Sequence, residues 1–156
     1  MASKQGRPTP RRAVLALGFV LLSLLAAVAA PSTSSAQVDT RRERVYLSEL
    51  ALLIEGSRRL IGFSESNLED RDLLKFAHPL AERYVEMANH MLPTAKVVVA
   101  HPHLMLVVEN LERAIDAAAS ADSGTYQKRM RIARDELANL EAVLKQLKLR
   151  LPESPR

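Results

Sequence analysis

Apolar residues recur at intervals of three and four along most of the chain, most clearly in its last third. Their positions alternate steps of four and three over more than three heptads, at Tyr126, Met130, Ala133, Leu137, Leu140, Leu144, Leu147 and Leu151. This spacing places one apolar seam on an α-helix, and its seven-residue period favours nearly parallel or antiparallel packing against neighbouring helices, as in a coiled coil. We expect this helix to end at Pro152.

The preceding segment repeats the pattern after Pro102, since proline is favoured at the first position of a helix. Its seam comprises Leu104, Val108, Leu111, Ile115 and Ala118. The residues Ala121-Asp122-Ser123-Gly124 then form a short turn. A short turn between two heptad-patterned helices predicts an antiparallel hairpin.

Two further helices are predicted upstream. The first opens at Thr40, where Glu43 completes the spacing of a capping box, and it stops near Gly62. The second follows a polar link, residues 63–69, in which Ser66 and Glu69 offer a second capping box. The seam of the first comprises Tyr46, Leu50, Leu53, Ser57 and Leu60, and that of the second comprises Leu73, Ala77, Leu80, Tyr84, Met87 and Met91.

Pro79 lies inside the second of these helices. A proline there removes a backbone donor and crowds the preceding turn, so we expect the helix to be kinked or broken near Pro79. Residues 94–100 fit either a short helix or an extended connector. The whole pattern predicts an all-α fold, an antiparallel up-down-up-down four-helix bundle that forms one domain over residues 37–156.

The first 36 residues carry a different pattern. A basic start precedes 18 almost wholly apolar residues, 13–30, and a stretch of small polar residues follows. This is the pattern of a secretory signal peptide, with cleavage expected after Ala36 or, alternatively, after Ala29. The protein is then exported, most simply to the periplasm and otherwise to the extracellular space. An uncleaved membrane anchor and export by the twin-arginine route, suggested by Arg11-Arg12, remain alternatives.

Subtracting this segment changes the charge of the protein. The signal holds four of the 22 basic residues and none of the 18 acidic ones, so the remainder carries 18 of each. The formal charge of +4 therefore gives no support for a nucleic-acid partner, and we expect none. The chain contains no cysteine, which excludes disulfides, thiolate metal sites and covalent haem attachment.

Few residues suggest chemistry. The candidate metal ligands are Met87, His90, Met91, His103 and Met105, because thioethers and imidazoles converging at one end of a helical hairpin suit copper, particularly Cu(I). The alternative interpretation is that the methionines are ordinary core residues. Haem is a further alternative, although no histidine lies on a clean inward seam. His78 and His101 each precede a proline and are interpreted as helix-start residues.

The sequence contains no glycine-rich phosphate loop and no activated nucleophile, so we do not expect an enzyme and predict no cofactor. We expect an exported helical bundle that acts as a binding or interaction module, for a protein partner or for itself. A membrane is a partner only if the signal is retained. The alternative function is a copper- or haem-binding bundle that uses His90 and the neighbouring methionines and histidines.

Overall fold

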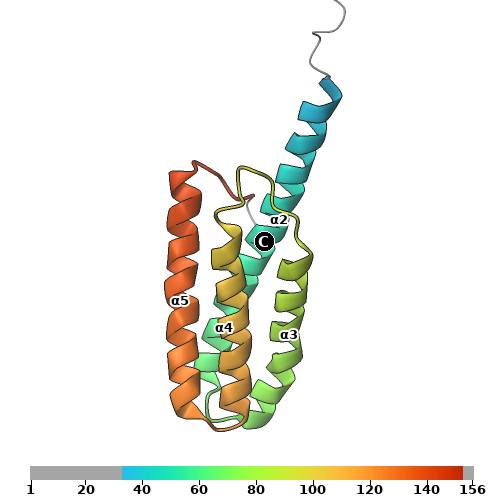
Figure 1. The fold of residues 1–156 in the computed structure, drawn as a ribbon. Coiled ribbons are helices and arrows are strands. Elements are labelled where there is room, and N and C mark those ends of the chain that lie inside the picture. The colour runs from blue at the N-terminus through green and yellow to red at the C-terminus, as the bar shows by residue number, and fades with distance from the viewer. Residues whose placement is uncertain (1–32, 153–156) are drawn as a thin grey trace, which may run out of the picture. The chain divides into compact units, whose positions relative to one another are not determined.

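The computed structural model describes residues 33–152 of the 156-residue chain, and side chains from residue 37 onward. These residues form four helices and no strand, and consecutive helices contact each other in a manner consistent with a helical bundle (Figure 1). The four helices are α2 (Thr33–Ser66), α3 (Arg71–His90), α4 (His101–Ala119) and α5 (Ser123–Gln146). The basic start and apolar centre of the predicted signal lie outside the described residues.

Polar pairs between helices define how the helices run relative to one another. In two pairs of helices, a step of seven residues forward on one helix matches a step of seven backward on the other, which requires an antiparallel arrangement. These contacts are His103–Glu136 and Asn110–Arg129 between α4 and α5, and Arg58–Glu141 and Glu65–Arg134 between α2 and α5. Seven residues correspond to two helical turns, so each pair of contacts lies on one face.

The predicted seams of α2, α4 and α5 form most of the core. All five predicted positions of α2 and all five of α4 are buried, as are the first six of the eight predicted for α5. Ser57 is the one polar residue among these seam positions, and within the described chain its Oγ has no hydrogen-bond partner. The sequence prediction of an apolar core shared by these helices is therefore confirmed.

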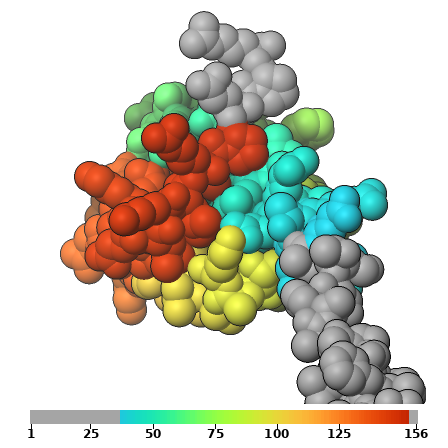
Figure 2. Space-filling view, turned by 90° about the horizontal axis from the view of Figure 1, so that it is seen from above, coloured from blue at the N-terminus to red at the C-terminus, as the bar shows by residue number. Residues whose placement is uncertain are grey.

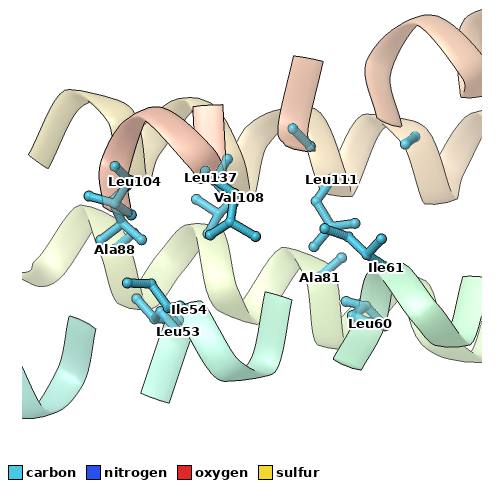
Figure 3. Packing of buried hydrophobic residues seen from close by; sticks show 14 of the residues in the cluster. Leu53, Ile54, Leu60, Ile61, Ala81, Ala88, Leu104, Val108, Leu111 and Leu137 are labelled. Carbon is cyan, nitrogen blue, oxygen red and sulfur yellow. The ribbon is translucent and has the colours of Figure 1, made fainter. Parts of the chain in front are cut away.

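The predicted seam of α3 is right at Ala77 and Met91, which are buried, and wrong at Leu73 and Leu80. Leu73 and Leu80 are exposed, and the residues that face the core are Leu74, Ala77, Ala81 and Ala88. Figure 3 shows Ala81 and Ala88 between leucine and isoleucine side chains of α2 and α4. Small side chains at these positions let α3 approach both neighbours closely, and this leaves the larger residues on the opposite side.

Helix α3 continues through Pro79 without interruption, so the predicted break does not occur. Proline cannot donate a backbone hydrogen bond to the carbonyl of Lys75, four residues earlier. Pro79 and Lys75 are both exposed, so that carbonyl lies on the solvent side, where water can satisfy it.

The predicted capping boxes are also wrong. Helix α2 begins before Thr40 and extends past Gly62 to Ser66, and α3 is capped by Asp70, whose carboxylate accepts a hydrogen bond from the Leu73 N–H at 3.0 Å. Aspartate is among the best N-cap residues.

The link between α3 and α4 is neither a helix nor an extended strand. After Met91 the chain makes successive tight turns, with hydrogen bonds from Val97 N–H to Thr94 O and from Ala100 N–H to Val97 O. Val97 and Ala100 are buried, and these two residues anchor the link to the core. None of the helices within residues 33–152 combines the length and apolar content that crossing a bilayer requires.

Helix α5 ends at Gln146, six residues before the predicted stop at Pro152. Lys148 adopts a left-handed backbone conformation, with φ 55°, and the Leu149 N–H bonds to Leu144 O at 3.0 Å. This hydrogen bond and the positive φ identify a Schellman motif, which turns the chain away from the helix axis. As a result Leu147 and Leu151 lie outside the helix whose seam they were predicted to extend.

Candidate functional site

The side chain of Tyr84 on α3 reaches across to Gly56 on α2. A Cβ atom at position 56 would lie 2.5 Å from the Tyr84 Oη, so only glycine leaves room for this ring in its observed position. Burial raises the pKa of Tyr84, and the positive charge of Arg59 partly lowers it. Arg59 therefore lies on the side of α2 that is turned toward α3.

Large apolar side chains lie exposed on both sides of this contact. On α2, Leu52 and Phe63 share the helical face of Gly56 because they lie four and seven residues from it. On α3, Leu80 and Leu73 lie four and eleven residues before Tyr84 and share its face, and Phe76 lies one turn before Leu80. We call these five residues the outer face; their exposed fractions run from 38% for Phe63 to 86% for Phe76.

Other exposed large apolar residues lie mainly in the links between helices, at Leu68, Leu92, Val98 and Val99. Among the described residues, the exposed large apolar side chains include four on α2 and three on α3, but one on α4 and none on α5. The two additional residues on α2 are Val38 and Val45, which precede Leu52 at seven-residue intervals and so continue its stripe along the helix. Large exposed apolar patches on soluble proteins mark interaction sites.

Two ion pairs lie at mid-height beside the outer face. Arg59 Nε bonds to Glu55 Oε1 at 2.8 Å on α2, and Arg83 Nη1 bonds to Glu86 Oε2 at 2.5 Å on α3. All four side chains are at least one third exposed, and exposed pairs within one helix stabilise it by only about 0.3–0.5 kcal/mol. These charges are therefore available to a partner at little cost to the fold.

A cleft of about 710 Å³ lies at the upper end of the same side, between the first half of α2 and the link that follows α3. Figure 2 views the molecule from this end and shows the link beside α2. Lys96 on the link pairs with Glu43 on α2 at 2.9 Å. The remaining lining residues are a mixture of charged and apolar ones: Asp39, Arg41, Arg42, Val45, Tyr46, Glu49, His90, Leu92, Pro93, Thr94 and Ala95.

Tyr46 lies at the inner wall of this cleft and joins α2 to the start of α4. Its hydroxyl lies 3.1 Å from Nδ1 of His101, and burial raises the pKa of Tyr46 to about 12. Burial also lowers the pKa of His101, because it disfavours the charged imidazole. His101 begins α4, as its position before Pro102 predicted. Its side chain is partly buried in contact with Tyr46, which the sequence did not predict.

Three of the five predicted metal ligands meet in one place. Met87, His90 and Met91 line a small hollow of about 170 Å³ together with Glu49, Arg83 and Glu86. Imidazole and thioether groups are suitable ligands for Cu(I), and the same hollow also holds the Arg83 guanidinium and the carboxylates of Glu49 and Glu86. Within residues 33–152, no three His, Asp or Glu side chains are grouped as metal ligands would be.

The other two predicted ligands lie elsewhere. His103 Nδ1 contacts Glu136 Oε2 on α5 at 2.7 Å, and Met105 is packed against the core. Neither residue is among those that line the hollow. His78 likewise joins two helices, since its Nε2 lies 3.0 Å from Glu112 Oε1 on α4, so its interpretation as a helix-start residue is wrong.

The chain matches no protein-family model, no curated protein and no solved structure with which we compared it. The assignment of function therefore rests on the site itself. Sequence reasoning missed the outer face because it assigned Leu73 and Leu80 to the core. The sequence nevertheless contained a clue, because α3 carries two apolar faces, whereas a helix that packs against the core on a single side needs one apolar face.

Proposed function

We propose that this chain is an exported, periplasmic protein whose antiparallel, up-down-up-down four-helix bundle binds another protein chain through the outer face. One observation carries the proposal. Helix α3 buries Leu74 and three alanines but exposes Leu73, Phe76 and Leu80, whereas a helix serving only the core of a bundle needs a single apolar face. Burying these three residues against a partner would remove apolar area from water.

The chemistry of the rest of the molecule supports an interaction module rather than a catalyst. The described histidines outside the small hollow each contact a side chain of another helix, which gives them structural roles. The export pattern at the N-terminus and the absence of cysteine agree with a domain that relies on helix packing alone in an oxidising compartment.

Site-specific photo-crosslinking tests the binding proposal in the native compartment. We would place a photoreactive phenylalanine analogue at Phe76 in the full-length chain, irradiate intact cells and separate the periplasmic extract. We expect an adduct of discrete mass. The same analogue at Lys128, an exposed position on α5, is the matched control and should give none. No discrete adduct at position 76 would contradict the proposal.

Intact mass spectrometry of the periplasmic extract tests the export component separately. We expect the mass of a chain that begins at Gln37, or at Ala30 if the signal is cut after Ala29. A full-length mass recovered in the membrane fraction would show that the segment is retained as an anchor instead.

A further inference from the structure

We propose that the partner of the outer face is a second copy of this chain, related to the first by a two-fold axis that lies at the level of Gly56 and Tyr84 and runs across the helices. This proposal rests on the proposed function and specifies its partner. In such a dimer α2 faces the partner's α2 and α3 faces the partner's α3, in both cases antiparallel. A two-fold interface requires one surface that is complementary to itself when it is turned end over end.

The charges at mid-height meet this requirement. Each helix carries one acidic and one basic side chain a single turn apart, Glu55 and Arg59 on α2 and Arg83 and Glu86 on α3. Turning either helix end over end about this level brings its acid opposite the partner's base. Each residue then has an ion-pair partner in its own chain and another in the second copy.

The apolar residues meet it as well. With a rise of 1.5 Å per residue, Phe63, Leu80, Phe76 and Leu73 lie roughly 6 to 16 Å below the Gly56–Tyr84 level. Leu52 and Val45 on α2 lie about 6 to 16 Å above it by the same measure. The two-fold rotation therefore brings the lower group of one copy to the level of the upper group of the other, and on α2 it places Phe63 between the levels of the partner's Leu52 and the partner's Val45.

The size of the surface is adequate. The two groups together span about 32 Å along the bundle, and two adjacent helices are about 20 Å wide, which gives roughly 600 Å² on each copy. A total near 1,200 Å² is at the lower limit for a specific, stable interface. We therefore expect a dimer of moderate affinity, with a Kd in the micromolar range, rather than an obligate one.

Sedimentation equilibrium over a range of protein concentrations tests this proposal with the protein expressed from the full-length chain. We expect a monomer–dimer equilibrium. The Phe76→Ser variant should raise the dimer Kd at least tenfold, because Phe76 is the most exposed apolar residue of the outer face. Circular dichroism at 222 nm, unchanged in each variant, shows that the fold is retained.

Charge variants test the arrangement itself. Arg59→Glu puts like charges opposite each other across the axis and should raise the Kd about fivefold, whereas the double variant Glu55→Arg/Arg59→Glu restores complementarity and should return the Kd to the wild-type value. Arg113→Glu is the matched control, because Arg113 pairs with Glu109 at the same i,i+4 spacing on α4, away from the outer face. Its Kd should stay within twofold of wild type.

The outcomes separate this proposal from the function on which it rests. A protein that stays monomeric at all concentrations, or a dimer unaffected by Phe76→Ser and Arg59→Glu, overturns the two-fold dimer. A crosslinked adduct at Phe76 with twice the mass of the chain supports the dimer. An adduct with a different protein keeps the proposed function and overturns self-association, and no discrete adduct overturns both.

Discussion

The turn between α4 and α5 contains a residue in an unfavourable backbone conformation, and replacing it should stabilise the protein. Ala121 has φ 64°, in the left-handed region. It is held there by a Schellman motif in which the Asp122 N–H bonds to Ala117 O at 2.8 Å and the Ala121 N–H bonds to Ala118 O at 3.0 Å. Glycine is the residue that this position favours.

The expected gain follows from two opposing terms. In the left-handed region a residue with a Cβ destabilises the folded state by about 1–2 kcal/mol, whereas glycine adopts this conformation without strain. Glycine also gains about 0.4–1 kcal/mol of conformational freedom in the unfolded chain, which opposes folding. The net effect of Ala121→Gly is therefore a stabilisation of about 1 kcal/mol, or roughly 4 °C in Tm for a domain of this size.

Thermal and urea unfolding followed by circular dichroism measures this change. Lys148→Gly should behave in the same way, because Lys148 occupies the equivalent position after α5 with φ 55°. Ser120→Gly is the control: Ser120 has φ −88°, so glycine there brings flexibility without relief and should lower the free energy of unfolding. An Ala121→Gly variant with unchanged or lower Tm would refute the reasoning.

Three further predictions concern single side chains. Ser57→Ala should raise the free energy of unfolding by about 1 kcal/mol in urea titrations, because a buried hydroxyl without a partner is removed. His101 has a lowered pKa, so its contribution to stability is complete above the ordinary histidine pKa near 6.5 and is lost as the pH falls below it; His101→Gln should flatten the fall in urea midpoint between pH 7.5 and 5. Hydrogen bonds from Thr125 lower the pKa of Asp122, so Asp122→Ala should lower Tm at neutral pH, and the difference from wild type should shrink as the pH falls through that lowered pKa.

The heptad seams of α4 and α5 could be predicted from the sequence because each helix has one apolar face. On α5 the positions between the seam residues are mostly charged, so only one register is possible. On α2 the predicted seam is buried as well, including the polar Ser57, although this helix also carries the exposed stripe of Val45 and Leu52. Burying large residues at every turn gives these registers a clear free-energy advantage.

The register of α3 could not be predicted in the same way. Leu73 and Leu80 are larger than Ala77 and Ala81, and a rule that maximises buried area assigns the larger residues to the core. The structure instead places the small residues of α3 inward. Leu53, Leu60 and their neighbours on α2 already fill the core at these levels, and small side chains on α3 keep the packing dense without overlap. Which helix supplies the bulk at each level depends on all the helices at once.

The prediction of where the helices begin and end was wrong for a local reason. Several residues near each end were able to cap, and the sequence alone does not say which one the turn geometry selects. Asp70, not Ser66, caps α3, and Asp122, which was predicted only as part of a turn, caps α5. The residue with the left-handed backbone conformation is Ala121, whereas Gly124 lies inside α5. A glycine is thus a permissive signal for a turn, and its absence does not prevent one.

The candidate site was hidden by the same feature that now identifies it. A helix with two apolar faces is ambiguous in sequence, because either face can be assigned to the core. Once α3 is placed with its alanines inward, its second face has no partner within the described chain, and the stripe on α2 lies beside it. The charged exterior of α5 and the apolar exterior of α2 and α3 then give the bundle two different sides. Folding alone accounts for the first, and we propose that a partner chain covers the second.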